Sequence, residues 1–501
     1  MNIFDRYVMA TNPVKGLERM KARAMAQGLQ KIQKASAGYD AAGSGRRWFK
    51  GQSTSQNTEN KKSLRAMRQV SRELERNYPS VGTACQVNES YIVGNGIIPK
   101  AKGLGNTSAK KVQLANDLMA NWVGDTEIDY YGNSNFFAQQ GLFARTVCAS
   151  GESLFVRRDA RDRRLDVPLR LQLVEGDFID DSKDSNAAGT RNMVQGIEFI
   201  NGRKANYYLY NEHPGDVGFI SNSSVPVAAD EIAHGFELLR PGQVRGLPWG
   251  YSVFNIIKGL SDFDDAFIEL QRMAACFGAF VYEEEPDQNA PKNSILPDDM
   301  EPQTIVRLQG SERVVFSSPP TVSGQTSFTQ RQDRIIASGY GIAYSALTGD
   351  FSTGNFAAEK MARIQMYMNI ARRRNRILRP QLKKIEKWWL EAAALAGYDL
   401  RGVYFDWTPP KKEILDIKNE LPVIIQKIRA GLGSLQGELR EMGIDDPSQV
   451  LYELKDDKDL IESLHLTLDS MASQTNKNGQ IQTAPAPETD NQQSENADEE
   501  E

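Results

Sequence analysis

Cysteine and histidine are scarce in this chain of 501 residues, and it has no long apolar run. Its three cysteines, Cys85, Cys148 and Cys276, lie far apart in the sequence, which argues against a disulfide framework and against a cysteine-based zinc knuckle. The three histidines are also scattered, and the His-Glu-x-x-His string of zinc hydrolases is absent. The longest nearly uncharged apolar run, residues 273–282, is far too short to span a bilayer, so we expect no membrane association.

Motifs that usually carry catalysis are missing as well. The chain has no phosphate-binding Gly-x-x-x-x-Gly-Lys-Ser/Thr string, no Gly-x-Gly-x-x-Gly after a predicted strand and no Gly-x-Ser-x-Gly nucleophile elbow. Asp262, Asp264 and Asp265 point to different faces of a predicted helix, which favours a solvated surface over a metal site. We therefore expect a protein that is not an enzyme and that needs no cofactor and no metal.

One carboxylate cluster leaves an enzymatic alternative open. Asp177, Asp180 and Asp181 lie near the end of a predicted strand, where carboxylates could hold the metal of a nuclease. The sequence shows no basic or histidine partner for them. His234, within a short apolar stretch, is most simply interpreted as a structural histidine.

The overall composition is that of a folded protein. Apolar residues make up 40% and charged residues 25% of the chain, enough to bury a sizeable core. The first residues are mixed in character and do not resemble a signal peptide. We therefore expect a protein that is made and kept in a cytoplasm.

The two ends of the chain carry opposite charge, which the formal net charge of −5 conceals. Residues 1–80 hold sixteen Lys and Arg against six Asp and Glu, a balance of +10. We expect residues 1–60 to form a basic mobile arm that contacts nucleic acid or wraps an acidic neighbour, so a monomeric basic-armed DNA-binding protein is a further alternative. Residues 471–501 hold one Lys against seven acids, and we expect a disordered acidic tail there, either solvated or used for an interaction.

The first half of the chain predicts a mixed body of helices and strands. Helical patterning covers residues 62–93, with Pro79 opening a second helix, and returns at about 107–123 and 135–150. Between residues 152 and 238 the apolar period shifts to two, which predicts several strands. The predicted fold class is α+β and helix-rich.

Two long helices and an acidic insertion follow. The first helix is predicted over residues 251–283, where apolar side chains repeat at spacings of three and four from Val253 to Phe277. That seam predicts packing against another helix, either in the same chain or in a neighbouring copy. Residues 283–326 hold eight acids against three bases, and a second helix is predicted from about 328 to 346.

A polar loop with two glycines, residues 349–355, leads into a very long helix predicted over 356–396. Pro380 lies within this helix and is expected to kink it near Arg376, whose carbonyl loses its hydrogen bond. The helix carries a basic stripe that could meet DNA or pair with acids of a neighbouring subunit. At 100° per residue this stripe contains Arg372, Arg376, Arg379, Lys383 and Lys387.

Several short motifs, taken in order, resemble the lambda family of bacteriophage portal proteins over roughly residues 35–450. The most specific is the Gly-Gln-x-Arg-Gly turn at 242–246, before the first long helix. The others are Tyr39 to Trp48, Leu64-Arg65, Ser71 to Asn77, Ile92 to Ile97, Gly151-Glu152, Tyr344 to Leu347 with Asp350 and Ser352, and Arg372 to Arg374. Their order and spacing together carry the resemblance. The chain departs from it at Pro422, where an unbroken helix is expected, and in the acidic tail.

The resemblance implies a portal-type protomer that assembles with its own copies into a ring, usually a dodecamer, around a central channel at one capsid vertex. DNA would pass through this channel without base readout. The implied parts, in chain order, are the basic arm (1–60), an α+β wing (61–250), a first stem helix (251–283), a clip (284–327), a second stem helix (328–347), a tunnel loop (348–356), a long kinked wing helix with a strand (357–410), a helical crown (411–470) and the acidic tail (471–501).

The resemblance also implies partners and the surfaces that meet them. Besides its own copies and double-stranded DNA, these are the large subunit of the packaging terminase, the major capsid and scaffold proteins, and the head-completion or adaptor proteins. The implied location is the portal vertex of the virion, and the host cytoplasm during assembly. The tunnel-loop residues nearest the DNA would be Asp350, Phe351, Ser352, Thr353, Gly354 and Asn355. The clip would dock partners through Glu283, Glu284, Glu285, Asp287, Asp298, Asp299 and Glu301.

Overall fold

The computed structural model describes residues 54–160, 164–185, 191–216, 223–275, 279–283, 312–316, 324–352, 354–410, 416–442, 444 and 447–464. The chain divides after Glu59, and the contacts reported below are made within residues 60–501. Most of the predicted basic arm and all of the predicted acidic tail lie outside the described residues. No helix in the described ranges is long and apolar enough to cross a membrane.

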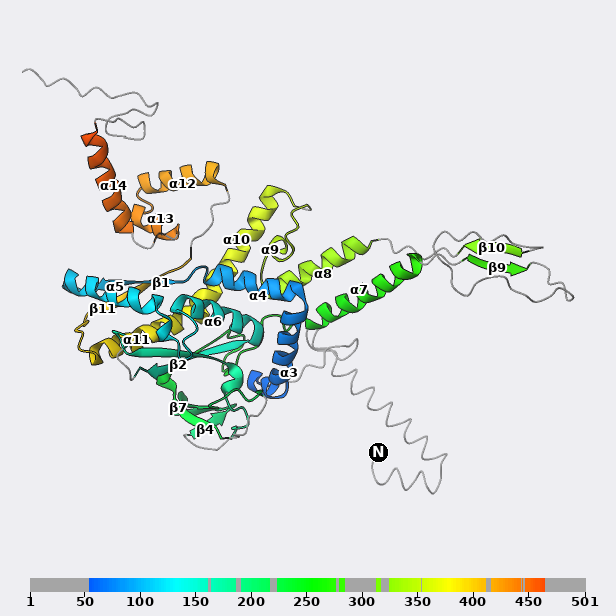
Figure 1. Ribbon diagram of the computed structural model, residues 1–501, viewed down its shortest axis with the longest axis horizontal. Helices are drawn as coiled ribbons and strands as arrows, with labels where there is room; N and C mark the ends of the chain where they lie inside the picture. Colours follow the sequence, from blue (N-terminus) through cyan, green and yellow to red (C-terminus); the bar gives the residue numbers. More distant parts are fainter. Residues whose placement is uncertain are drawn as a thin grey trace, which may run out of the picture. The chain divides into compact units, whose positions relative to one another are not determined.

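Four helices open the described part of the chain, where helical patterning predicted them (Figure 1). Pro79 starts the second helix at its first turn, where its missing N–H removes no hydrogen bond. Asn135 caps the fourth helix by accepting a hydrogen bond from the Ala138 N–H, and Gly151 ends it at a φ of +89°. The helices are α3 (Gln56–Asn77), α4 (Pro79–Ile92), α5 (Ala109–Gly124) and α6 (Phe136–Ser150).

Strands follow, as the alternating apolar pattern after residue 152 predicted, and they pair antiparallel. A three-stranded sheet has the order β3–β2–β8, and a four-stranded sheet has the order β4–β5–β6–β7. A separate pair joins β1 to β11, which are far apart in the chain. The strands are β1 (Ile98–Gly103), β2 (Glu152–Asp159), β3 (Leu169–Glu175), β4 (Arg191–Val194), β5 (Ile197–Ile200), β6 (Arg203–Leu209), β7 (Val225–Ala228), β8 (Ile232–Phe236) and β11 (Val403–Thr408).

The main hydrophobic core joins these helices to strand β2 and to a late helix, α11 (Arg379–Leu395). Phe143 of α6 stacks on Phe155 of β2 with 4.9 Å between ring centroids. Trp389 of α11 meets Phe405 of β11 edge to face at 5.3 Å. Because both pairs are fully buried, they fix the helices on the sheet at positions that short-range patterning cannot specify.

Two helices, α7 (Phe254–Ala275) and α8 (Gln325–Tyr340), lie side by side (Figure 1). Phe263 and Phe328 touch across them, with 4.7 Å between ring centroids. The apolar seam predicted on the first helix is thus covered, at this point, by a helix of the same chain. Among the two alternatives left open by the sequence, the contact within the chain is present.

The first of the two predicted long helices is shorter than expected. The prediction of one helix over 251–283 is wrong at its end, since β9 (Ala279–Glu283) is a strand paired with β10 (Glu312–Phe316). Val281 and Tyr282 favour an extended backbone, and the partner strand that stabilises it comes from a distant segment. The predicted strand at 313–316 is confirmed, and the one at 303–308 lies outside the described residues.

The helix predicted after the acidic insertion is also shorter than expected. The helix expected over 328–347 ends at Tyr340, and Gly341 adopts a φ of +72°, which a side chain would disfavour. A short helix, α9 (Tyr344–Thr348), follows. The apolar period continues across Gly341, so the pattern alone does not reveal the break.

The long helix after the polar loop contains the predicted irregularity. Pro380 cannot donate a hydrogen bond to the carbonyl of Arg376, and that carbonyl lies in a π-helical segment, Arg374–Leu378.

Pro422, where an unbroken helix was expected, lies inside α12. The remaining helices are α10 (Phe356–Arg373), α11 (Arg379–Leu395), α12 (Ile417–Arg429), α13 (Leu435–Glu441) and α14 (Pro447–Ser463).

Candidate functional site

The Gly-Glu motif and the Gly-Gln-x-Arg-Gly turn meet in a buried ion cluster. The carboxylate of Glu152, the first residue of β2, is fully buried and pairs with the guanidinium groups of Arg245 and Arg68. Arg245 donates from Nε to Glu152 Oε1 at 2.8 Å, and the Gly246 N–H donates to Oε2 at 2.9 Å. The Gly-Glu motif therefore holds the Gly-Gln-x-Arg-Gly turn that leads toward α7.

The turn is held at further points. Arg245 donates to the carbonyls of Gln195 at 3.0 Å and Gly176 at 2.7 Å. Gln243 donates from Nε2 to the carbonyl of Arg245 at 2.8 Å. A Cβ at Gly246 would lie 2.1 Å from the carbonyl oxygen of Gly151, so only glycine fits at this position.

His234 belongs to the same cluster. Its Nε2 lies 3.0 Å from Glu152 Oε2, and its Nδ1 lies 3.4 Å from the hydroxyl of Tyr207. Burial lowers the pKa of His234 to about 4, so the ring is neutral near pH 7. Burial alone would raise the pKa of Glu152, but Arg245 and Arg68 outweigh it and hold that pKa well below its ordinary value. This placement agrees with the interpretation of His234 as a structural histidine.

The aspartates of the nuclease alternative are not brought together as metal ligands. Asp177 pairs with Arg68 and Arg72, basic partners that the sequence did not reveal. Asp180 is buried and accepts hydrogen bonds from Tyr210 at 2.8 Å and Ser224 at 2.6 Å. These bonds serve the packing of the loop and leave Asp180 no exposed oxygen to offer.

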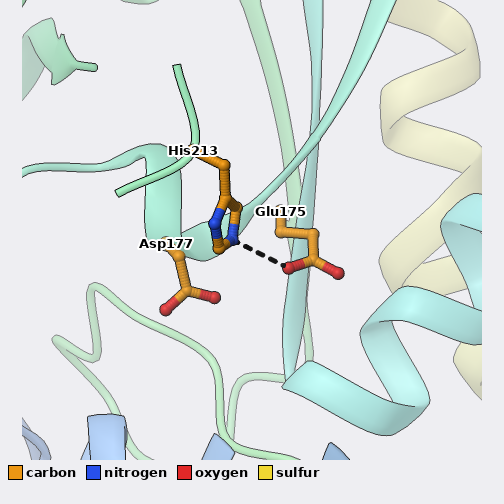
Figure 2. Close-up of side chains that lie close together, drawn as sticks. All are labelled: Glu175, Asp177 and His213. Carbon is orange, nitrogen blue, oxygen red and sulfur yellow. Dashed lines mark ion pairs between the residues drawn. The ribbon is translucent and has the colours of Figure 1, made fainter. Parts of the chain in front are cut away.

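A different trio, Glu175, Asp177 and His213, does lie together, with ligand atoms within 4.8 Å (Figure 2). Arg72, however, already pairs with both carboxylates. His213 Nδ1 accepts a hydrogen bond from the Gly215 N–H at 3.0 Å, and its Nε2 lies 3.5 Å from Glu175. Arg72 and the Gly215 N–H thus already occupy groups that a metal ion would need, and the trio gives the nuclease alternative no support.

A second junction ties the end of α8 to α4 and α10. Arg373 stacks over Trp249, with 3.7 Å from its guanidinium carbon to the ring centroid. It donates to Asn88 Oδ1 at 2.9 Å and to the carbonyl of Tyr340 at 2.6 Å. Arg374 donates to the carbonyl of Ile92 at 2.8 Å and so satisfies the end of α4. The Arg372 to Arg374 motif thus connects α10 to α4 and to the end of α8.

The polar loop before α10 is pinned at its ends. Asp350 accepts hydrogen bonds from the Tyr344 hydroxyl at 2.8 Å and from the Ser352 N–H at 2.9 Å. Asn355 accepts a hydrogen bond from the Ala358 N–H at 2.8 Å and caps α10. Phe351 is 57% exposed, Gly354 is also exposed, and Thr353 lies outside the described residues. The loop offers short polar side chains and one aromatic ring to its surroundings.

The basic stripe is partly paired within its own chain. Arg372 pairs with Glu237 at 3.1 Å, Lys383 with Glu386 at 2.8 Å, and Lys387 with Glu391 at 3.8 Å. Arg376 and Arg379 are exposed and form no ion pair with the described part of the chain.

Of the predicted clip acids, Glu283 is the last residue of β9, opposite Glu312. The other six lie outside the described residues: Glu284, Glu285, Asp287, Asp298, Asp299 and Glu301.

Comparison with known proteins gives one consistent family. The family described as "Phage portal protein, lambda family" matches residues 43–374. The "Probable portal protein" of Halomonas phage phiHAP-1 is 21% identical over 400 residues, covering 74% of this chain and 75% of that protein. The "Portal protein" of Escherichia phage N15 is 22% identical over 435 residues, covering 74% of this chain and 80% of that protein.

Among solved structures, similarity is distant. A chain from "Virion of native gene transfer agent (GTA) particle" is 13% identical, with a TM-score of 0.44, and covers 81% of this chain and 97% of that chain.

Proposed function

Because the chain belongs to the lambda family of phage portal proteins, we propose that it forms a dodecameric ring at one capsid vertex, through which DNA enters during packaging and leaves during ejection. Portal proteins of this family are structural components and not enzymes. The family match over residues 43–374 is the observation that carries the proposal. The buried contacts of Glu152 with Arg245 and of Arg373 with Trp249 support it, because motifs of the resemblance make them.

We assign the parts of the protomer with the corrected boundaries. The wing comprises residues 61–250 together with the long kinked helix and the strand of 357–410, and α7 with α8 forms the stem. The strands β9 and β10 belong to the clip, which docks the large terminase subunit during packaging and head-completion or adaptor proteins afterwards. Residues 411–470 form the crown, and the ring sits in the capsid among major capsid and scaffold proteins. Assembly takes place in the host cytoplasm.

DNA slides through the ring with little adhesion. A net charge of −5 per copy, repeated around the ring, opposes a tight phosphate clamp. The loop around Asp350 presents short polar groups that touch the duplex without reading bases. Of the basic stripe, Arg376 and Arg379 are the residues available to DNA on the head side or to a neighbouring subunit, since the other three have acidic partners in the chain.

Native mass spectrometry with negative-stain imaging of the purified chain tests the proposal. We expect rings of about a dozen copies with a central hole, formed either alone or after addition of scaffold protein. A chain that remains monomeric at high concentration and with scaffold protein would contradict a ring-forming portal. Salt-sensitive DNA binding by that monomer, lost on deletion of residues 1–60, would favour a basic-armed DNA-binding protein.

A further inference from the structure

Helix α10 has an outer face that carries no charge. Over a sector of about 140° around the helix axis, its side chains are apolar except for one glutamine. Met361 is 66% exposed, Met368 is 70% exposed and Ile364 is 39% exposed. The buried residues Met366 and Ile370 lie on the opposite side of the helix. The apolar face of α10 consists of Ala357, Ala358, Met361, Ile364, Gln365, Met368 and Ala371.

Helix α12 carries a second face of this kind. Its aliphatic side chains fall within a sector of about 100°, with no charged residue among them. Ile417 is 65% exposed, and no residue of α12 is buried. Uncovered apolar faces of this extent mark sites of interaction in soluble proteins. The aliphatic face of α12 consists of Ile417, Leu421, Ile424, Ile425 and Ile428.

Helix α14 matches these faces less well. Leu454 and Ile461 lie on one side of it, but Asp457 and Lys458 each fall within about 60° of both. Charges in an apolar contact lose their water without gaining a partner, which opposes the contact. Helices α10 and α12 are therefore the better matched pair.

An ion pair fixes the level of α12 beside α10. Lys360 Nζ lies 2.7 Å from Glu420 Oε1 and 4.0 Å from Asp416 Oδ2. Met361 and Leu421 are the next residues along the two helices, yet both are exposed, so this pairing does not join the apolar faces within one chain. Rotation about a ring axis keeps every group at its height along the axis. The α12 helix of the next copy therefore lies at the height of the first turns of α10.

We propose that the aliphatic face of α12 packs on the apolar face of α10 in the next copy of the ring. This inference rests on the proposed ring and names a contact that closes it. Contacts in a ring are head to tail and join two different faces, and here one chain supplies both. DNA is a poor occupant of either face, because phosphate groups bind to cations and neither face has one.

Site-directed cross-linking tests the contact. One chain carries Met361→Cys and a second chain carries Leu421→Cys. Both also carry Cys276→Ser, which leaves Cys85 and Cys148, both buried, as the native thiols. The two chains are mixed, assembled into rings with scaffold protein and treated with a short bismaleimide. We expect a covalent dimer that joins one chain of each kind.

The matched control places the cysteine on the far side of α12. Gln426→Cys takes the place of Leu421→Cys, since Gln426 is exposed and points away from the aliphatic face. Because the contact raises the effective concentration of the two thiols, the test mixture should give about tenfold more covalent dimer than the control mixture.

A charge placed in the aliphatic face gives a second test. Leu421→Asp should lower the ring yield by about tenfold or more, because the contact would bury an unpaired carboxylate. Gln426→Asp should leave the ring yield unchanged. Since no residue of α12 is buried in the single chain, both variants should unfold as the wild-type monomer does, which separates loss of the contact from loss of the fold.

The failures of the contact and of the ring are distinguishable. If the wild type forms rings but the two mixtures cross-link equally, the contact is wrong and the proposed portal function stands. The same holds if cross-linking occurs only inside one chain that carries both Met361→Cys and Leu421→Cys, or if Leu421→Asp forms rings in full yield and loses only terminase binding. If the wild type forms no rings under any condition, the proposed function fails and the contact fails with it.

Discussion

Glu152 and Arg245 form a fully buried ion pair across 93 residues of sequence, with 2.8 Å between Arg245 Nε and Glu152 Oε1. A buried charge is tolerated only when its partners compensate for lost water. Here two arginines, a backbone N–H and His234 surround one carboxylate. The pair connects strand β2 to the turn that precedes α7.

Glu152→Gln should therefore destabilise the protein by about 3–5 kcal/mol, because Arg245 and Arg68 would remain buried without a counter-charge. Chemical denaturation of the monomer measures the change in free energy of unfolding. Asp159→Asn, at the exposed end of the same strand, is the matched control and should change stability by less than about 0.5 kcal/mol. Equal effects of the two substitutions would contradict the role given to the cluster.

Two glycines of the same turn differ in the space around them. Gly246→Ala should cost at least about 3 kcal/mol, because the new Cβ would collide with the backbone of Gly151. Gly242 has a φ of +78° but no atom within 4 Å of an added Cβ, so Gly242→Ala should cost only about 1–2 kcal/mol of backbone strain. Thermal unfolding of both variants checks the order. If Gly242→Ala proved the more damaging, the close approach at Gly246 would be wrong.

Acid should weaken the fold through His234. In the unfolded chain this residue titrates near its ordinary pKa of 6.5, whereas in the native state its pKa lies at about 4. Between these values the unfolded state binds more protons, so stability falls as pH falls, by about 2 kcal/mol from about pH 7 to about pH 5. The lowered pKa of Glu152 acts in the same direction below its ordinary value of 4.5.

His234→Gln should flatten this pH dependence, since glutamine keeps a donor for Glu152 and does not titrate. Denaturation curves of wild type and variant at the two pH values give the comparison. An unchanged slope would assign the acid sensitivity to other groups.

Local elements could be predicted from local chemistry. Asn135 and Gly151 mark the ends of α6, and Pro380 marks the irregular turn of the long helix, because capping, positive φ and a missing N–H act within a few residues. The strand β9 was missed, since its pairing partner, β10, comes from a separate segment. Strand pairing depends on tertiary contact more than on intrinsic preference.

The long-range contacts that join the motifs could be predicted from the sequence only in part. The Gly-Glu and Gly-Gln-x-Arg-Gly strings were noticed as motifs, but nothing in their spacing shows that Glu152 and Arg245 touch. Cys85 and Cys148 illustrate the same limit: they are far apart in sequence, yet both are buried free thiols in one core. Contacts of this range depend on the packing of whole helices and sheets.

The loop between α9 and α10 should serve DNA and not assembly. Deleting residues 349–355 removes Asp350 and its hydrogen bond with Tyr344. The buried contacts around Glu152 and around Arg373 stay intact. We therefore expect normal ring yield but impaired packaging or retention of DNA in heads assembled with the variant. Native mass spectrometry and the DNA content of purified heads measure the two properties separately. Heads filled with DNA at the wild-type level would refute the assignment of this loop to the channel, whereas loss of rings would make it an assembly element.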